Sequence, residues 1–112
     1  MSDQASTSKG IAKRYATALF DLANETDDIP KLEHNVNILT QSIDESTDLN
    51  SLISSPLYSR DQQKSAVTAV ATKMGLSGVM INTLSLMAEK RRLFVVPTFL
   101  LVLKDLMQNL IK

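Results

Sequence analysis

The sequence predicts an all-α protein, a compact six-helix bundle folded as a single domain. Six segments carry apolar residues at the 3.6-residue period of a helix, and no stretch alternates like a strand. Three glycines and three prolines interrupt the 112 residues, so the links between helices are short. Aromatic residues make up 4% of the chain, so aliphatic side chains must fill the core, which favours helices packed on helices.

The first predicted helix spans residues 9–25, with Ser8 as its N-cap. Residues 1–7 are polar, and we expect a disordered tail there and a folded domain over 8–112. This helix carries two apolar stripes where a surface helix needs one. The first stripe consists of Ala12, Ala16, Leu19 and Ala23, and the second consists of Ile11, Tyr15, Ala18 and Leu22. Either the helix is buried on both sides within its own domain, or the second stripe receives another helix.

Two helices follow the polar break at 26–28. Pro30 fits the first turn of the second helix, where its missing N–H costs nothing. One apolar stripe lines that helix, and polar residues cover the rest. A second polar break at 46–48 caps a short third helix, which must end before Pro56. The apolar residues of these two helices are Leu32, Val36, Leu39, Ile43, Leu49, Leu52 and Ile53.

The last three helices have clear boundary signals. Ser59 and Gln62 have the spacing of a capping box at the start of the fourth helix, and Gly75 supplies its left-handed stop. Ser77 caps a fifth helix over 78–91. Residues 93–96 lead to a sixth helix with Pro97 in its first turn. The apolar face of the sixth helix consists of Phe99, Leu100, Leu103, Leu106, Met107 and Leu110.

The fifth helix repeats the pattern of the first. Its core stripe is Met80, Leu84, Met87 and Ala88, and a weaker second stripe is Val79, Asn82, Thr83 and Leu86. Two helices with a spare stripe each can lie side by side and form a groove for a partner helix. Lys90 continues the second stripe within the charged run 89–92. That run is either a solvated helix end or an anchor for an acidic partner segment.

We find no catalytic constellation in the sequence. The chain has no cysteine, and its one histidine, His34, sits on a polar helix face without a partner. No metal or cofactor site is predicted. Twelve basic and twelve acidic residues balance, which argues against nucleic acid as a partner. No apolar run is long enough to insert into a membrane.

Three segments together resemble a known family: RYATALFDLA at 14–23, LISSPL at 52–57 followed by Lys64, and NTLSLMAEKRRL at 82–93. In order and spacing they are similar to the N-terminal domain of the delta-subunit family of bacterial F-type ATP synthases. The mitochondrial member of that family is the oligomycin-sensitivity-conferring protein. The resemblance covers almost the whole chain from about Ile11.

The resemblance implies a non-catalytic stator in the peripheral stalk, which holds the catalytic head against rotation during proton-driven ATP synthesis. It implies that the N-terminal helix of an alpha subunit binds between the first and fifth helices. Peripheral-stalk b subunits would contact a second, C-terminal domain that this chain lacks, so we expect an N-terminal domain alone. The implied location is peripheral, on the cytoplasmic face of the bacterial inner membrane. The expected partner-helix site is Ile11, Tyr15, Ala18, Leu22, Val79, Asn82, Thr83, Leu86 and Lys90.

Two other classes of protein are compatible with a small helical bundle. The first is an RNA-binding module similar to the NusB antitermination fold, which also begins with an arginine- and alanine-rich helix. A basic stripe would support that class, but the basic residues here are scattered among acids. The second is a small helical enzyme, for which the sequence offers no acid, base or metal cluster.

Overall fold

A computed structural model describes residues 3–111 of the chain, and the side chains of residues 8–109. These residues form six α-helices and one 3₁₀ turn without a strand, which confirms the predicted fold class. The elements are α1 (Asp3–Glu25), α2 (Ile29–Glu45), α3 (Thr47–Ser54), α4 (Arg60–Met74), α5 (Gly78–Glu89), η1 (Leu93–Val95) and α6 (Val96–Ile111).

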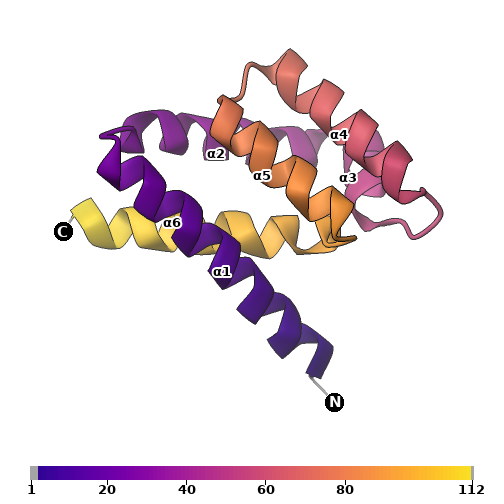
Figure 1. Ribbon diagram of the computed structural model, residues 1–112, viewed down its shortest axis with the longest axis horizontal. Helices are drawn as coiled ribbons and strands as arrows, with labels where there is room; N and C mark the ends of the chain where they lie inside the picture. Colours follow the sequence, from indigo (N-terminus) through magenta and orange to yellow (C-terminus); the bar gives the residue numbers. More distant parts are fainter. Residues whose placement is uncertain (1–2, 112) are drawn as a thin grey trace.

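The first and last helices form the centre of the bundle. Helix α1 crosses α6 and makes its most extensive contact there, α2 lies against α6, and α4 pairs with α5 (Figure 1). The short α3 joins the α2 side to α4. The Cα radius of gyration is 13.5 Å, against about 13 Å expected for a compact chain of this length. The chain therefore forms one compact globule with one core.

The predicted core stripes are buried, except that Leu106 of α6 is only partly buried. Ala12 and Ala16 of α1 are fully inaccessible, and such small side chains allow close packing of α1 on α6, its main neighbour. The predicted core stripes of α2, α3 and α5 are also buried without exception. In α4, Val67 and the small Ala71 are buried beside α5. Leu110 lies outside the residues whose side chains the structure describes.

The predicted helix ends at Ser46, Ser59 and Gly75 are confirmed. The Ser46 hydroxyl accepts a hydrogen bond from the Leu49 N–H at 3.1 Å. The capping box of α4 is complete, because the Ser59 N–H donates to Gln62 Oε1 at 2.8 Å and the Gln62 N–H donates to Ser59 Oγ at 3.1 Å. Gly75 ends α4 in the left-handed region, with φ of 78°.

Two predicted boundaries of the first and fifth helices are wrong. Helix α1 begins at Asp3 instead of residue 9, so it includes Ser8 and the part of the expected disordered tail from residue 3 onward. No proline interrupts that stretch, so no residue there stops the helix. Helix α5 ends at Glu89 instead of residue 91.

The early end of α5 has a local cause. Arg91 takes the left-handed conformation, with φ of 60°. The Arg92 N–H then donates to the Met87 carbonyl at 2.7 Å, and the Arg91 N–H donates to the Ala88 carbonyl at 3.0 Å. These are the two hydrogen bonds of a Schellman motif, which glycine usually closes. The turn redirects the chain into η1, and α6 then starts without a further link.

Two buried polar side chains contradict the expectation that polar residues only cover the surface. Asn35 of α2 is 1% exposed and bridges to the start of α5. Its Nδ2 donates to Ser77 Oγ at 2.9 Å, and its Oδ1 accepts from the Ser77 N–H at 3.3 Å. Gln63 of α4 is also buried, and its Nε2 donates to the Leu52 carbonyl at 3.1 Å. Both side chains fix one helix to its neighbour.

Across the described residues, every helix is either too short or too polar to cross a membrane.

Candidate helix-binding surface

Helices α1 and α5 lie next to each other and run in opposite directions (Figure 1). Leu22, near the end of α1, lines the same hollow as Val79, at the start of α5. Further back along α1, the Tyr15 hydroxyl accepts a hydrogen bond from Arg92 Nη1 at 3.3 Å, just beyond the end of α5. The two helices that carry a spare stripe are therefore neighbours, as the sequence predicts.

The spare stripes face outward. Leu22, Val79 and Leu86 are 42%, 42% and 45% exposed. Ala18 and Asn82 are exposed as well, while Thr83 is half-buried. Helix α1 is therefore not buried on both sides within its own domain. We call the eight residues of the two spare stripes the α1–α5 surface: Ile11, Tyr15, Ala18, Leu22, Val79, Asn82, Thr83 and Leu86.

The part of this surface nearest the N-terminus is anchored to the core. Ile11 and Tyr15 are partly buried and pack against core residues. Thr83 uses its hydroxyl to donate to the Val79 carbonyl at 2.9 Å, so its methyl group remains for packing. Large side chains thus alternate with the small Ala18 and Thr83 along the surface. This alternation gives the ridges and grooves into which the side chains of another helix can pack.

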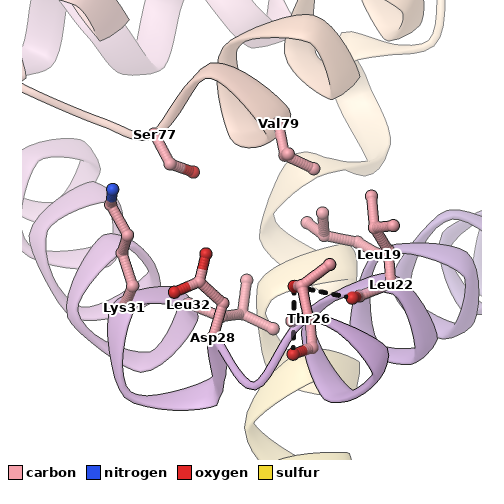
Figure 2. Close-up of a pocket in the computed structure, with 9 residues that line it drawn as sticks. Leu19, Leu22, Thr26, Asp28, Lys31, Leu32, Ser77 and Val79 are labelled. Carbon is pink, nitrogen blue, oxygen red and sulfur yellow. Dashed lines mark hydrogen bonds between the residues drawn. The ribbon is translucent and has the colours of Figure 1, made fainter.

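One end of the surface has a small hollow (Figure 2). Leu22 and Val79 line it together with Thr26, Lys31 and Ser77, and its volume is about 30 Å³. The Thr26 hydroxyl turns back and donates to the Leu22 carbonyl at 2.9 Å. A space of this size holds one or two water molecules and is too small for a cofactor. It is a shallow depression at one end of the α1–α5 surface.

The opposite end of the surface is basic. Arg92 contacts Tyr15, and Lys90 is exposed as the C-cap of α5. Lys90 therefore follows the stripe in sequence but lies outside the helix, contrary to the expectation of a helix through residue 91. Because its backbone is already turning, Lys90 belongs to the end of the surface rather than to the stripe.

Groups of residues typical of a metal centre are absent from the part of the chain that the structure describes. No cluster of three His, Asp or Glu side chains there could hold a metal ion. His34 is exposed on α2, away from the α1–α5 surface. The pKa of Glu89 is lowered, first because Lys64 Nζ donates a hydrogen bond to its carboxylate at 2.9 Å. That pair is exposed and lies at a helix end.

Sequence reasoning missed the residues that frame this surface. Arg92 was assigned to the charged run, and nothing in the helical period places it against Tyr15. Thr26 and Lys31 lie in the α1–α2 link and the first turn of α2, whose positions depend on the fold. The sequence predicts Ser77 only as a helix cap. Its hydrogen bond with Asn35 has one sequence signal, which is that Asn35 lies between the core residues Leu32 and Leu39 of the same helix.

These features define a class: a small helical-bundle domain with an exposed apolar surface on two antiparallel helices. The model of the ATP synthase delta (OSCP) subunit family matches residues 11–110. The chain belongs to that family, which confirms the resemblance found in the sequence.

Curated relatives agree with this assignment. The chain is 51% identical over 106 residues to the ATP synthase subunit delta of Roseobacter denitrificans, covering 95% of this chain and 57% of the relative. It is 56% identical over 105 residues to that of Ruegeria pomeroyi, covering 94% of this chain and 56% of the relative. The chain thus spans slightly more than half the length of these relatives.

Proposed function

We propose that the α1–α5 surface binds an amphipathic helix, the N-terminal helix of an ATP synthase alpha subunit, and that the chain serves as a stator component of the enzyme complex. The observation that carries the proposal is the pair of outward-facing apolar stripes on neighbouring antiparallel helices. The choice of partner is supported by the relatives, which are named ATP synthase subunit delta, because an alpha subunit is part of the same enzyme complex.

The apolar area suits a helix-in-groove contact. Full burial of a Leu or Val side chain contributes about 1.5–3 kcal/mol, so covering the exposed part of Leu22, Val79 and Leu86 contributes roughly 2–4 kcal/mol in total. Ile11 and Tyr15 extend the contact, and Ala18 leaves room for the partner backbone. Because both helices are held by the core, the surface is already formed before the partner arrives, which lowers the entropic cost of binding.

A stator needs a durable joint rather than a reaction. Rotation inside the enzyme puts torque on the catalytic head, and a slowly dissociating helix contact can resist it. In this proposal the chain is not an enzyme and uses no cofactor. The peripheral-stalk b subunits would bind a C-terminal domain outside this chain. The assembly would lie on the cytoplasmic face of the bacterial inner membrane.

The deciding experiment is a binding titration with a synthetic peptide of the alpha-subunit N-terminus. Ala18→Trp should abolish binding, because a bulky side chain fills the place of the partner helix. Its circular dichroism and melting temperature should stay unchanged, because Ala18 is exposed. The matched control is Ala69→Trp, at an exposed position on α4, which should bind like the wild type. Wild-type-like binding of Ala18→Trp, or its unfolding, would refute the proposed site.

Lys90 tests the basic end of the surface. Lys90→Glu should slow association with the alpha peptide at low salt, because it places a repulsive charge where an acidic residue would dock. The difference should shrink near 0.5 M salt, where the Debye length is about 4 Å. Stopped-flow rates at two ionic strengths measure this, with Lys73→Glu on exposed α4 as control. Equal low-salt rates for Lys90→Glu and Lys73→Glu would exclude a role for Lys90.

A further inference from the structure

A second hollow lies on the other side of the α5 terminus. The end of α3, the α3–α4 turn and the link from α5 to η1 enclose about 300 Å³. Its lining includes Arg91 and Phe94 from the α5–η1 region and Ile53 and Pro56 from the α3–α4 region. Arg92 reaches from the same link to Tyr15 on α1, so the two adjacent arginines extend to different elements. This hollow shares no residue with the α1–α5 surface.

The cation in this hollow has only neutral partners. Arg91 Nη1 donates to the Tyr58 carbonyl at 2.8 Å and to Gln63 Oε1 at 3.1 Å. Among the described residues, no carboxylate lies within 4 Å of its guanidinium, and Nε and Nη2 donate no hydrogen bond. A guanidinium offers five donors in a planar fork that matches a carboxylate. Donors and charge therefore remain for a ligand.

The surroundings add positive charge. Lys64, Lys90 and Arg60 all lie close enough to Glu89 to lower the pKa of its carboxyl. With Arg91 these residues make four cations, against the two acids Asp61 and Glu89 in the same two segments, whereas the whole chain has a net charge of zero. The excess is local, so it favours an anionic group at this end of the molecule.

Arg91 also occupies a costly position. Its φ of 60° is the left-handed conformation at which a Schellman motif normally has glycine. A residue with a Cβ adopts this conformation only with backbone strain. The fold therefore holds a long cationic side chain at a place where glycine would form the same turn without strain.

The apolar part of the region points to a peptide rather than a free anion. Phe94 is 47% exposed, and Leu57, in the same turn as Pro56, is 91% exposed. A small anion on Arg91 would leave both side chains in water. A peptide that carries an acidic side chain beside a large apolar one can meet the guanidinium and cover Phe94 at once.

We propose that this hollow is a second docking site, which takes an acidic peptide segment of a partner protein, with an Asp or Glu carboxylate on Arg91 and a neighbouring large apolar side chain against Phe94. This docking site is separate from the α1–α5 surface and shares no residue with it.

The test uses a cellulose array of hexapeptides in which Glu or Asp precedes Leu, Ile or Phe, each paired with its Gln or Asn counterpart. The folded 112-residue chain is applied, and affinities of the retained peptides are measured by fluorescence anisotropy. Acidic peptides should bind roughly fivefold more tightly than their amide counterparts, as expected for a partly exposed charge pair. Equal binding of the acidic and amide series would overturn the proposal.

Two variants keep the test independent of folding. Arg91→Gly removes the guanidinium and the backbone strain together, and should abolish the preference for acidic peptides. Phe94→Ala should weaken both series while keeping the acidic preference and the melting temperature. The control Lys73→Gln, an exposed cation on α4, should change neither. Retention of the preference in Arg91→Gly, or full competition by millimolar acetate as for a small-anion site, would refute the proposal.

Discussion

Replacing Asn35 with alanine tests how far the fold depends on the polar bridge between α2 and α5. The amide is 1% exposed and exchanges two hydrogen bonds with Ser77, which itself caps α5. Each lost hydrogen bond costs about 1 kcal/mol, and leaving the Ser77 N–H without an acceptor adds about 1–2 kcal/mol. Alanine returns roughly 0.5 kcal/mol through its higher helix propensity. The expected loss is therefore about 2–4 kcal/mol.

The matched control is Asn37→Ala, two residues further along α2 at an exposed position. It makes the same change in helix propensity without touching the bridge, so the difference between the two variants isolates the bridge. Urea unfolding followed by far-UV circular dichroism measures both, and an unchanged m-value shows that the comparison is valid. If the two variants differ by less than about 1 kcal/mol, the bridge does not stabilise the fold as argued.

Three further predictions concern helix ends and surface charge. Gly75→Ala should destabilise the fold by about 1 kcal/mol, because φ is positive at residue 75, although nothing lies within 4 Å of the new Cβ. Gly10→Ala, inside α1, should stabilise the fold by about 0.5–1 kcal/mol. Thermal melts that rank the two variants the other way would contradict this. Ser59→Ala should cost about 1 kcal/mol in urea unfolding by removing the capping box, while Ser65→Ala, in exposed mid-α4, should not. Lys64→Gln should raise the pKa of Glu89 toward its ordinary value, measured by NMR titration. Because the folded pKa of Glu89 lies below the unfolded one, the pair stabilises at neutral pH and the contribution is lost as the pH falls through the folded pKa, so an unchanged Glu89 titration would refute this account.

The core was predictable because it depends on period and side-chain size alone. The alanines of α1 repeat at helical spacing, and a stripe that small has to meet another helix closely, as Ala12 and Ala16 do. The caps were predictable for a similar reason. Ser59 and Gln62 satisfy each other within one turn, so their geometry is local and needs no knowledge of the rest of the fold.

The features that could not be predicted from the sequence depend on contacts between distant residues or on an unusual backbone conformation. The period of α2 places Asn35 at the edge of its apolar stripe, but burial follows only once Ser77 comes to meet it. The end of α5 was missed because an arginine, not a glycine, adopts the left-handed turn, and no local rule favours that choice at Arg91. The outward direction of the spare stripes was left open by the sequence, since a broad apolar arc is also typical of a central helix.

The pairing of α1 with α6 has a consequence for how the chain is made. The most extensive contact of α1 is with the last helix, which begins at Val96. Between the end of α1 and the start of α6 the ribosome must add about 70 residues, which takes roughly 4–14 s at typical rates of synthesis. During that interval α1 lacks its main partner, while α4 and α5, close in sequence, can already pair. The bundle therefore cannot close until the last helix has been made and the two ends of the chain meet.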